Sequence, residues 1–217
     1  MVTAPARPVQ AVLAASSLVA GGGWTVAELL GPEAREALAV EARGCHAAGA
    51  TRAELDASPD EDERRGNPAR RLESAPGGPA LQALYTASVL QAWLRRLTGL
   101  DWVPSGGQGT YSYYRQEHDF LAVHRDVDEC DLAVIACVEE RGAPATGLAG
   151  SLSLWPERTA DRLSEIRRRP APGRVTVRLT PGQSIVLLGG QVPHALEALA
   201  AGHQRVVAPL CFRAAHG

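Results

Sequence analysis

Eight short apolar segments follow one another closely in the second half of the chain, with turn residues between them. They lie at about 110–115, 120–125, 131–138, 150–154, 174–179, 183–188, 194–198 and 205–212. Short segments bounded by Gly, Pro, Asn and Asp are typical of β-strands. Many such strands in succession favour an antiparallel jelly roll, because two facing sheets bury one side of every strand. The sequence therefore predicts a mostly β fold whose jelly-roll core spans residues 100–217.

The preceding region, residues 1–99, is expected to be mainly helical and to support the core from outside. Apolar residues recur at helical spacing over residues 24–49, with Gly31-Pro32 between two predicted helices, for which Thr25 is the expected N-cap and Gly31 the C-cap. A second pattern, from Leu81 to Leu97, closes at Gly99 and predicts an amphipathic helix. A chain of 217 residues suits a single domain, residues 1–217.

A charged segment rich in Pro and Gly separates these helices, at about residues 51–79. Long loops in compact domains are usually functional or disordered. Two interpretations stay open: a mobile surface loop, or a lid that contacts substrate.

His124 and Asp126 are the residues that most clearly suggest chemistry. If residues 120–126 are extended, side chains two positions apart share a face, so this imidazole and this carboxylate point the same way. Two such groups supply two of the three ligands of a facial metal site. His194, which follows the strand that ends at Gly189-Gly190, is the candidate for the third ligand.

The order of these residues resembles that of one large family. His124-x-Asp126, a distal His194 and Arg205 eleven residues later, within roughly residues 98–213, are similar to the motif of Fe(II)- and 2-oxoglutarate-dependent dioxygenases of the prolyl-hydroxylase-like kind. The resemblance implies a double-stranded β-helix, Fe(II) held by the three ligands, and 2-oxoglutarate and dioxygen (O2) on the open metal positions. It also implies that succinate and carbon dioxide are released.

The resemblance implies that Arg205 binds the distal carboxylate of 2-oxoglutarate. A planar guanidinium can hold a carboxylate with two hydrogen bonds. The family often has Ser or Thr two residues later, where this chain has Val207. Another hydroxyl group must then donate the remaining hydrogen bond to this carboxylate, and Tyr113, or else Tyr111, is expected to do so. Halogenating relatives carry Gly or Ala in place of the acid, so Asp126 points to hydroxylation or a related oxidation.

Other residues compete for these roles. His203 could replace His194, since Arg213 follows it by ten residues, but its surroundings indicate a tight turn. His46, His118 and His216 are expected to be structural or surface histidines, and Asp128 is expected to face solvent. Side chains that could line the substrate entrance are Trp102, Trp155 and Arg125, although packing is the simpler role for the two tryptophans.

Composition narrows the class of partner and the compartment. All 22 basic residues are arginine and the net charge is −2 without a basic stripe, so no nucleic-acid partner is expected. The apolar run Val9–Ala20 is shorter than the ~20 residues of a membrane span, so a strand or helix packed on the domain is expected rather than a signal peptide or membrane segment. The four cysteines form no C-x-x-C pair and are expected to be reduced, in a cytoplasmic protein.

The leading hypothesis is an oxygenase that hydroxylates an unactivated carbon of a small molecule, such as an amino acid or a specialised metabolite. A protein side-chain hydroxylase is the second choice. Val207 keeps open a cupin-like metal-dependent isomerase or hydrolase that needs no 2-oxoglutarate, and a barrel that only binds ligands is the non-enzymatic alternative. The sequence leaves the substrate and the oligomeric state undetermined.

Overall fold

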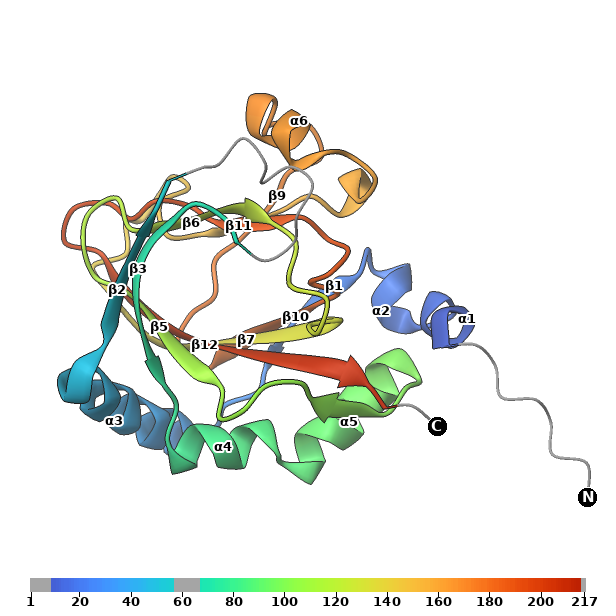
Figure 1. Cartoon of the computed structure of the whole chain (residues 1–217), viewed down its shortest axis with the longest axis horizontal. Helices are drawn as coiled ribbons and strands as arrows, with labels where there is room; N and C mark the ends of the chain where they lie inside the picture. The colour runs from blue at the N-terminus through green and yellow to red at the C-terminus, as the bar shows by residue number, and fades with distance from the viewer. Residues whose placement is uncertain (1–8, 57–66, 216–217) are drawn as a thin grey trace, which may run out of the picture.

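The structure, a computed structural model, describes residues 9–56 and 67–215, and its main feature is one curled antiparallel sheet (Figure 1). The strand order is β1-β10-β7-β12-β5-β3-β6-β11-β8-β9, with β2 paired to β3 and β4 paired to β12. The strands are β1 (Trp24–Glu28), β2 (Thr51–Leu55), β3 (Arg70–Pro76), β4 (Trp102–Pro104), β5 (Thr110–Tyr114), β6 (Phe120–His124), β7 (Leu132–Arg141), β8 (Leu152–Leu154), β9 (Val175–Val177), β10 (Gln183–Leu187), β11 (His194–Leu196) and β12 (Gln204–Ala214).

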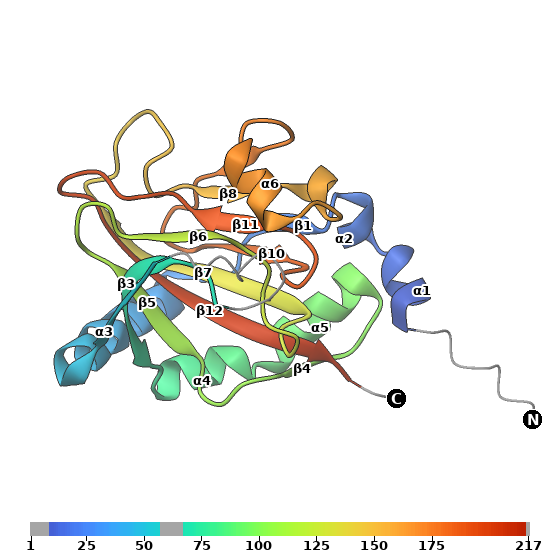
Figure 2. The same ribbon diagram turned by 45° about the horizontal axis from the view of Figure 1, so that its top comes forward.

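The sheet folds over itself into two facing layers. Strands β6, β8 and β11 lie over β5, β12, β7 and β10 (Figure 2). β3 joins the layers because it pairs with β5 (Ala75↔Tyr111) and also with β6 (Arg71↔Phe120). The predicted jelly roll is confirmed, and all eight predicted strands of the second half are present within a few residues of their expected bounds.

Helices cover the outside of the larger layer. They are α3 (Pro32–Gly49), α4 (Pro79–Tyr85) and α5 (Ser88–Thr98), which lie along its outer face in Figure 1. The sequence predicted one helix over 81–97, and the structure has two helices there, α4 and α5, with a break before Ser88. The carboxylate of Glu41 on α3 accepts hydrogen bonds from the backbone N–H groups of Gly78, Ala80 and Leu81, so it satisfies the free N-terminal donors of α4.

Two predictions for the first 99 residues are wrong. Residues 24–28 form strand β1 on the edge of the sheet beside β10, not a helix capped by Thr25. Within the predicted loop 51–79, β2 and β3 pair as antiparallel strands, and residues 57–66 lie outside the described residues. The first part of the chain therefore contributes strands to the same sheet as the jelly-roll core, as well as supporting helices.

The N-terminal apolar run forms two short helices, α1 (Val9–Ala14) and α2 (Ser17–Ala20), and α6 (Leu163–Arg168) packs over β6 on the smaller layer. None of the helices in the described residues is both long enough and apolar enough to cross a lipid bilayer.

The cysteines are not all reduced, contrary to expectation. Cys130, just before β7, and Cys211 on β12 form a disulfide, whereas Cys45 and Cys137 are free. Strands β7 and β12 are neighbours in the sheet, which brings together two sulfurs 81 residues apart in sequence. Disulfides persist mainly in oxidising compartments, so the cytoplasmic prediction loses the support that reduced cysteines gave it.

Replacing both Cys130 and Cys211 by alanine is expected to lower the free energy of unfolding by about 2–5 kcal/mol, because the bond closes a long loop in the unfolded chain. Chemical denaturation followed by circular dichroism measures this loss. Cys45→Ala is the matched control and should leave the unfolding midpoint nearly unchanged. An unchanged midpoint in the double variant would contradict a stabilising disulfide.

Candidate metal centre

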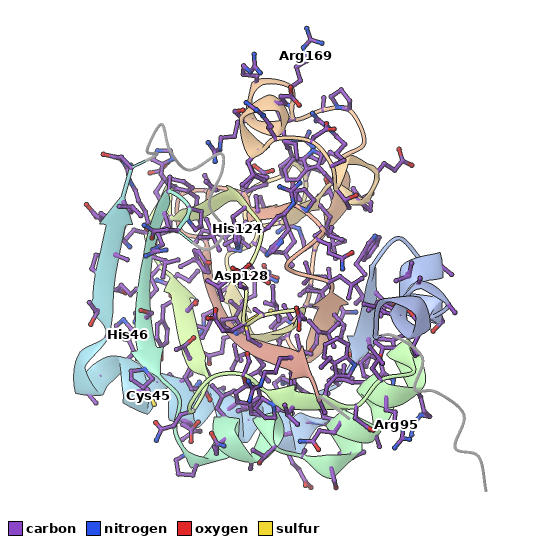
Figure 3. All side chains as sticks on the ribbon, turned by 45° about the vertical axis from the view of Figure 1, so that its right-hand side comes forward. Cys45, His46, Arg95, His124, Asp128 and Arg169 are labelled. Carbon is purple, nitrogen blue, oxygen red and sulfur yellow. A yellow bond between two sulfur atoms is a disulfide. The ribbon has the colours of Figure 1, made fainter. Side chains whose placement is uncertain are left out.

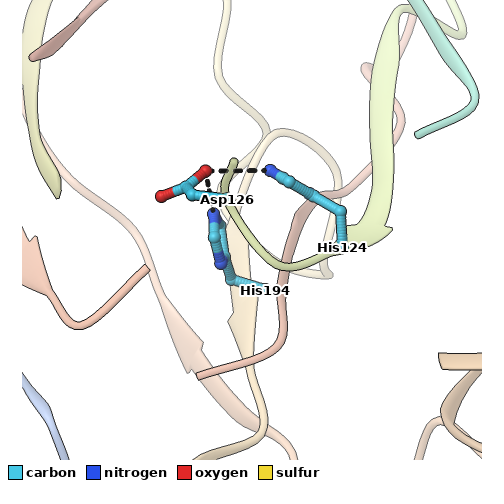
Figure 4. Close-up of side chains that lie close together, drawn as sticks. All are labelled: His124, Asp126 and His194. Carbon is cyan, nitrogen blue, oxygen red and sulfur yellow. Dashed lines mark ion pairs between the residues drawn. The ribbon is translucent and has the colours of Figure 1, made fainter. Parts of the chain in front are cut away.

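Strand pairing brings the three predicted ligands together. His124 is the last residue of β6 and His194 is the first residue of β11, and the two face each other directly across this antiparallel pair. Their ring centroids lie 4.2 Å apart. Asp126 follows β6 by two residues and points at both rings (Figure 4).

The donor atoms converge on one point. Asp126 Oδ1 lies 3.5 Å from His124 Nε2 and 3.6 Å from His194 Nε2, and the three donor atoms all lie within 4.8 Å of one another. Ligands about 2.0–2.2 Å from a metal ion, at right angles to each other, are separated by about 3 Å. The two carboxylate–imidazole separations exceed this value by about half an ångström, so small movements of the side chains would place three protein ligands on one face of a divalent cation.

Backbone hydrogen bonds fix the tautomer of both histidines. His124 Nδ1 lies 2.9 Å from the carbonyl oxygen of Ala122, and His194 Nδ1 lies 2.9 Å from that of Val192. A carbonyl can only accept, so each Nδ1 carries a proton, and the neutral form of each ring presents the lone pair of Nε2 to a metal. Hydrogen bonds of this kind orient metal-binding imidazoles.

Mutual electrostatics favour a charged Asp126. Burial raises its pKa, but the charges and hydrogen bonds of His194 and His124 outweigh burial and hold the pKa well below its usual value. Burial lowers the pKa of His124, and the neighbouring His194 lowers it further. Burial also lowers the pKa of His194, but the carboxylate of Asp126 outweighs burial and raises this pKa above its usual value. The site thus presents one carboxylate whose charge a cation can balance.

Gly189 leaves the space that Asp126 occupies. The backbone N–H of Asp126 donates to the carbonyl of Gly189 at 2.9 Å. A Cβ atom on Gly189 would overlap Oδ2 of Asp126 and would lie 2.7 Å from its Cγ. Any larger residue at position 189 would therefore move the ligand.

Gly189→Ala is expected to lower the affinity for Fe(II) by about 10–100-fold, the range typical when the support of a metal ligand is disturbed. Anaerobic equilibrium dialysis measures the affinity, and circular dichroism checks the fold. Gly44→Ala, on the exposed side of α3 where an added Cβ meets nothing within 4 Å, is the control. Equal metal affinity in the two variants would argue against this role of Gly189.

A cavity of about 90 Å³ extends from the three ligands into the barrel. Most of its wall is apolar. Its lining consists of His124, Asp126, His194, Arg205, Ser112, Tyr114, Leu121, Ala133, Ile135, Leu152, Ala195, Leu196, Val207, Pro209 and Cys211.

Arg205 lines this cavity as a buried cation with one edge unpaired. It is 1% exposed, and its Nη1 donates to Glu140 Oε1 at 2.5 Å and to the carbonyl of Leu179 at 3.1 Å. Within the described part of the chain, its Nε and Nη2 are buried without a hydrogen-bond partner. These two nitrogens lie on the same edge of the guanidinium, the geometry that grips a carboxylate with two hydrogen bonds.

Tyr111 and Tyr113 do not lie in the cavity, contrary to their predicted role. The hydroxyl of Tyr113 donates to the carbonyl of Ala42 at 2.7 Å, and that of Tyr111 donates to Glu41 at 2.9 Å, both on the side of α3. Alternation along β5 instead turns Ser112 and Tyr114 inward. Burial raises the pKa of Tyr114, so its hydroxyl stays protonated and can donate.

The remaining histidines lie away from the metal centre. His203 Nε2 is 3.1 Å from Glu140 Oε1, so His203 belongs to the surroundings of Arg205. His46 pairs with Glu73 beside α3, away from His124 (Figure 3), and His118 occupies a turn with φ 68°. His216 lies outside the described residues.

Of the three residues considered for the substrate entrance, the two tryptophans are buried and pack inside the fold. Trp102 donates from Nε1 to Thr98, and Trp155 donates to the carbonyl of Pro170. Arg125 donates to the carbonyls of residues 159, 161 and 191, which ties the segment before α6 to the segment that follows β6. Asp128 is exposed, as predicted.

No family model matches the sequence, and no curated protein matches it. Solved structures do match over most of the chain. A prolyl-4-hydroxylase from Pseudomonas putida matches with a TM-score of 0.59 and 20% identity, over 96% of this chain and 100% of the other. The 2-oxoglutarate-dependent epimerase SnoN of nogalamycin biosynthesis matches with a TM-score of 0.69 and 15% identity, over 94% and 80%.

HygX from Streptomyces hygroscopicus, solved with nickel, 2-oxoglutarate and hygromycin B, matches with a TM-score of 0.57 and 12% identity, over 88% of this chain and 82% of the other. At such low identities these similarities establish a shared fold. The chain has the double-stranded β-helix found in Fe(II)- and 2-oxoglutarate-dependent oxygenases.

Proposed function

We propose that the protein is an Fe(II)- and 2-oxoglutarate-dependent oxygenase that hydroxylates an unactivated carbon of a small molecule. One observation carries the proposal: the same small cavity holds three converging metal-ligand atoms and a buried arginine whose bidentate edge is unpaired. A buried, unpaired cationic edge is costly unless an anion fills it. A dicarboxylate cosubstrate that spans the metal and Arg205 satisfies both groups.

The iron would be held by Nε2 of His124, Nε2 of His194 and Oδ1 of Asp126. When bound there, ferrous iron supplies the chemistry that uses dioxygen and 2-oxoglutarate to oxidise a substrate and release succinate and carbon dioxide. The protein itself orients the ligands through the carbonyls of Ala122 and Val192 and excludes water with apolar walls.

The distal carboxylate of 2-oxoglutarate would bind Nε and Nη2 of Arg205. Tyr114 and Ser112 line the cavity with hydroxyl groups and replace Tyr113 and Tyr111 in this role. Ser112 is the cross-strand neighbour of Val207, so it presents a hydroxyl beside the position where the family often has Ser or Thr. This arrangement supports a 2-oxoglutarate site despite Val207, the residue that keeps open an isomerase or hydrolase that needs no 2-oxoglutarate.

A small-molecule substrate is supported by two proteins of similar fold: SnoN, an epimerase from nogalamycin biosynthesis, and HygX, which was solved with hygromycin B bound. Asp126 would supply the carboxylate ligand, which favours oxygen transfer over halogenation. A protein side chain is the alternative substrate, since a prolyl-4-hydroxylase shares the fold.

The proposal is tested by incubating purified protein with Fe(II), 2-oxoglutarate and dioxygen, with and without panels of amino acids and specialised metabolites. Succinate is measured by mass spectrometry. We expect succinate release that requires iron, increases with a suitable substrate and disappears in His124→Ala. Release at an equal rate in His124→Ala would contradict the proposal.

A further inference from the structure

We propose that Glu140 is a positioning residue that holds Arg205 in one orientation and thereby sets the chain length of the 2-oxo acid that the site accepts. This inference rests on the proposed function and concerns the same cavity. It starts from the part of the Arg205 guanidinium that does not face a cosubstrate.

Glu140 and Arg205 form a buried pair across two central strands. Glu140 on β7 is in register with Arg205 on β12, and its Oε1 accepts from Nη1 at 2.5 Å. The Glu140 side chain is 7% exposed and the Arg205 side chain is fully buried. The carbonyl of Leu179 accepts from the same Nη1, so two acceptors fix one end of the guanidinium.

Glu140 is itself held in place. His203 Nε2 lies 3.1 Å from the same Oε1, and Arg178 Nη1 lies 3.9 Å from it. The ring of His203 is buried against Gly150, where a Cβ atom would overlap the ring and lie 2.8 Å from Nδ1. Two donors, Arg205 Nη1 and His203 Nε2, therefore fix Oε1 of Glu140, and the charge of Arg178 lies close to the same oxygen.

The buried pair of Glu140 and Arg205 is better explained by the orientation that it gives Arg205 than by a contribution to the stability of the fold. Burying a carboxylate with a guanidinium often adds little net stability, because desolvation of both charges offsets their attraction. Glu140 also offsets the positive charge that would draw an anion toward Arg205. What the pair provides is a fixed direction for Nε and Nη2, the only donors of Arg205 without a partner among the described residues.

A fixed donor edge and a fixed metal centre define one distance. On the proposed function this is the distance that 2-oxoglutarate spans with both ends engaged, and 2-oxoadipate is longer by one methylene group. Without Glu140, the flexible stem of Arg205 could move to accommodate the longer acid. Glu140 should therefore increase the preference for 2-oxoglutarate, rather than act on the metal.

The test compares Glu140→Ala and Glu140→Gln with wild-type protein. We measure kcat and KM for 2-oxoglutarate and for 2-oxoadipate from succinate and glutarate release, together with Fe(II) affinity. In Glu140→Ala we expect KM for 2-oxoglutarate to rise about 10–100-fold with kcat within about 3-fold, because the loss of a fixed direction for Nε and Nη2 outweighs the removal of the Glu140 charge. The preference for 2-oxoglutarate over 2-oxoadipate should fall at least about 10-fold, with unchanged metal affinity.

Glu140→Gln keeps an acceptor for Nη1 and should restore most of the preference. Glu139→Gln is the matched control, because the adjacent Glu139 pairs with Arg43 outside this network, and it should behave as wild type. If Glu140→Ala does not fold, His203→Asn removes one support of the carboxylate and should shift the preference in the same direction, by a smaller factor.

The inference is overturned if the preference is unchanged in a folded Glu140→Ala or, failing that, in His203→Asn. It is also overturned if kcat and metal affinity fall together with the preference, or if Glu140→Gln fails to restore it. A wild-type protein that releases no succinate would instead refute the proposed function.

Discussion

Replacing Arg205 by methionine is expected to raise KM for 2-oxoglutarate by roughly 30- to 4,000-fold, equivalent to about 2–5 kcal/mol. The guanidinium supplies two donors to a carboxylate inside an apolar cavity, and methionine supplies none. Because removal of Arg205 alone would leave Glu140 buried without its main partner, the substitution is made together with Glu140→Gln. Steady-state kinetics of succinate release measure the change.

Two controls isolate the effect of Arg205. Glu140→Gln alone shows what the companion substitution contributes. Arg213→Met removes an exposed arginine from the same strand β12 and should leave KM unchanged. If the Arg205→Met/Glu140→Gln variant has the KM of Glu140→Gln, then Arg205 does not bind the cosubstrate.

Removing either histidine of the metal centre is expected to have the second large effect. His124→Ala and His194→Ala should each weaken Fe(II) binding by more than about 100-fold, which exceeds the 10–100-fold effect of changing a residue that only supports a ligand. Each substitution leaves two protein ligands, and a cation that keeps more water is held less firmly. Succinate release should fall to the background of iron-free protein.

Metal content after anaerobic reconstitution and desalting measures this loss. His118→Asn is the control, because His118 lies in an exposed turn with φ 68° that asparagine tolerates. Full iron content in His124→Ala or His194→Ala would mean that the metal binds elsewhere.

Much of the second half could be predicted from sequence because its signals are local. Short apolar segments bounded by turn residues mark strands, and the i, i+2 spacing places His124 and Asp126 on one face of an extended segment. His194 is 70 positions from His124 in the sequence, and only the family resemblance linked the two. In the structure they are close because they are cross-strand partners.

The predictions that failed depend on partners distant in sequence. Tyr113 and Tyr114 are both aromatic, and only the register of β5 against β12, which aligns Arg205 with Tyr114, decides which of them faces the cavity. Residues 24–28 carry a weak helical pattern but pair with β10, and the edge of a sheet overrides local propensity. The Cys130–Cys211 disulfide likewise depends on the pairing of β7 with β12.

Anaerobic calorimetric titration of 2-oxoglutarate into iron-loaded and iron-free protein is the most direct test of a shared site for metal and cosubstrate. We expect one equivalent to bind when iron is present. We expect much weaker binding when iron is removed or when Arg205→Met/Glu140→Gln is used. Binding of equal strength with and without iron, or no binding to the iron-loaded protein, would contradict the proposed site.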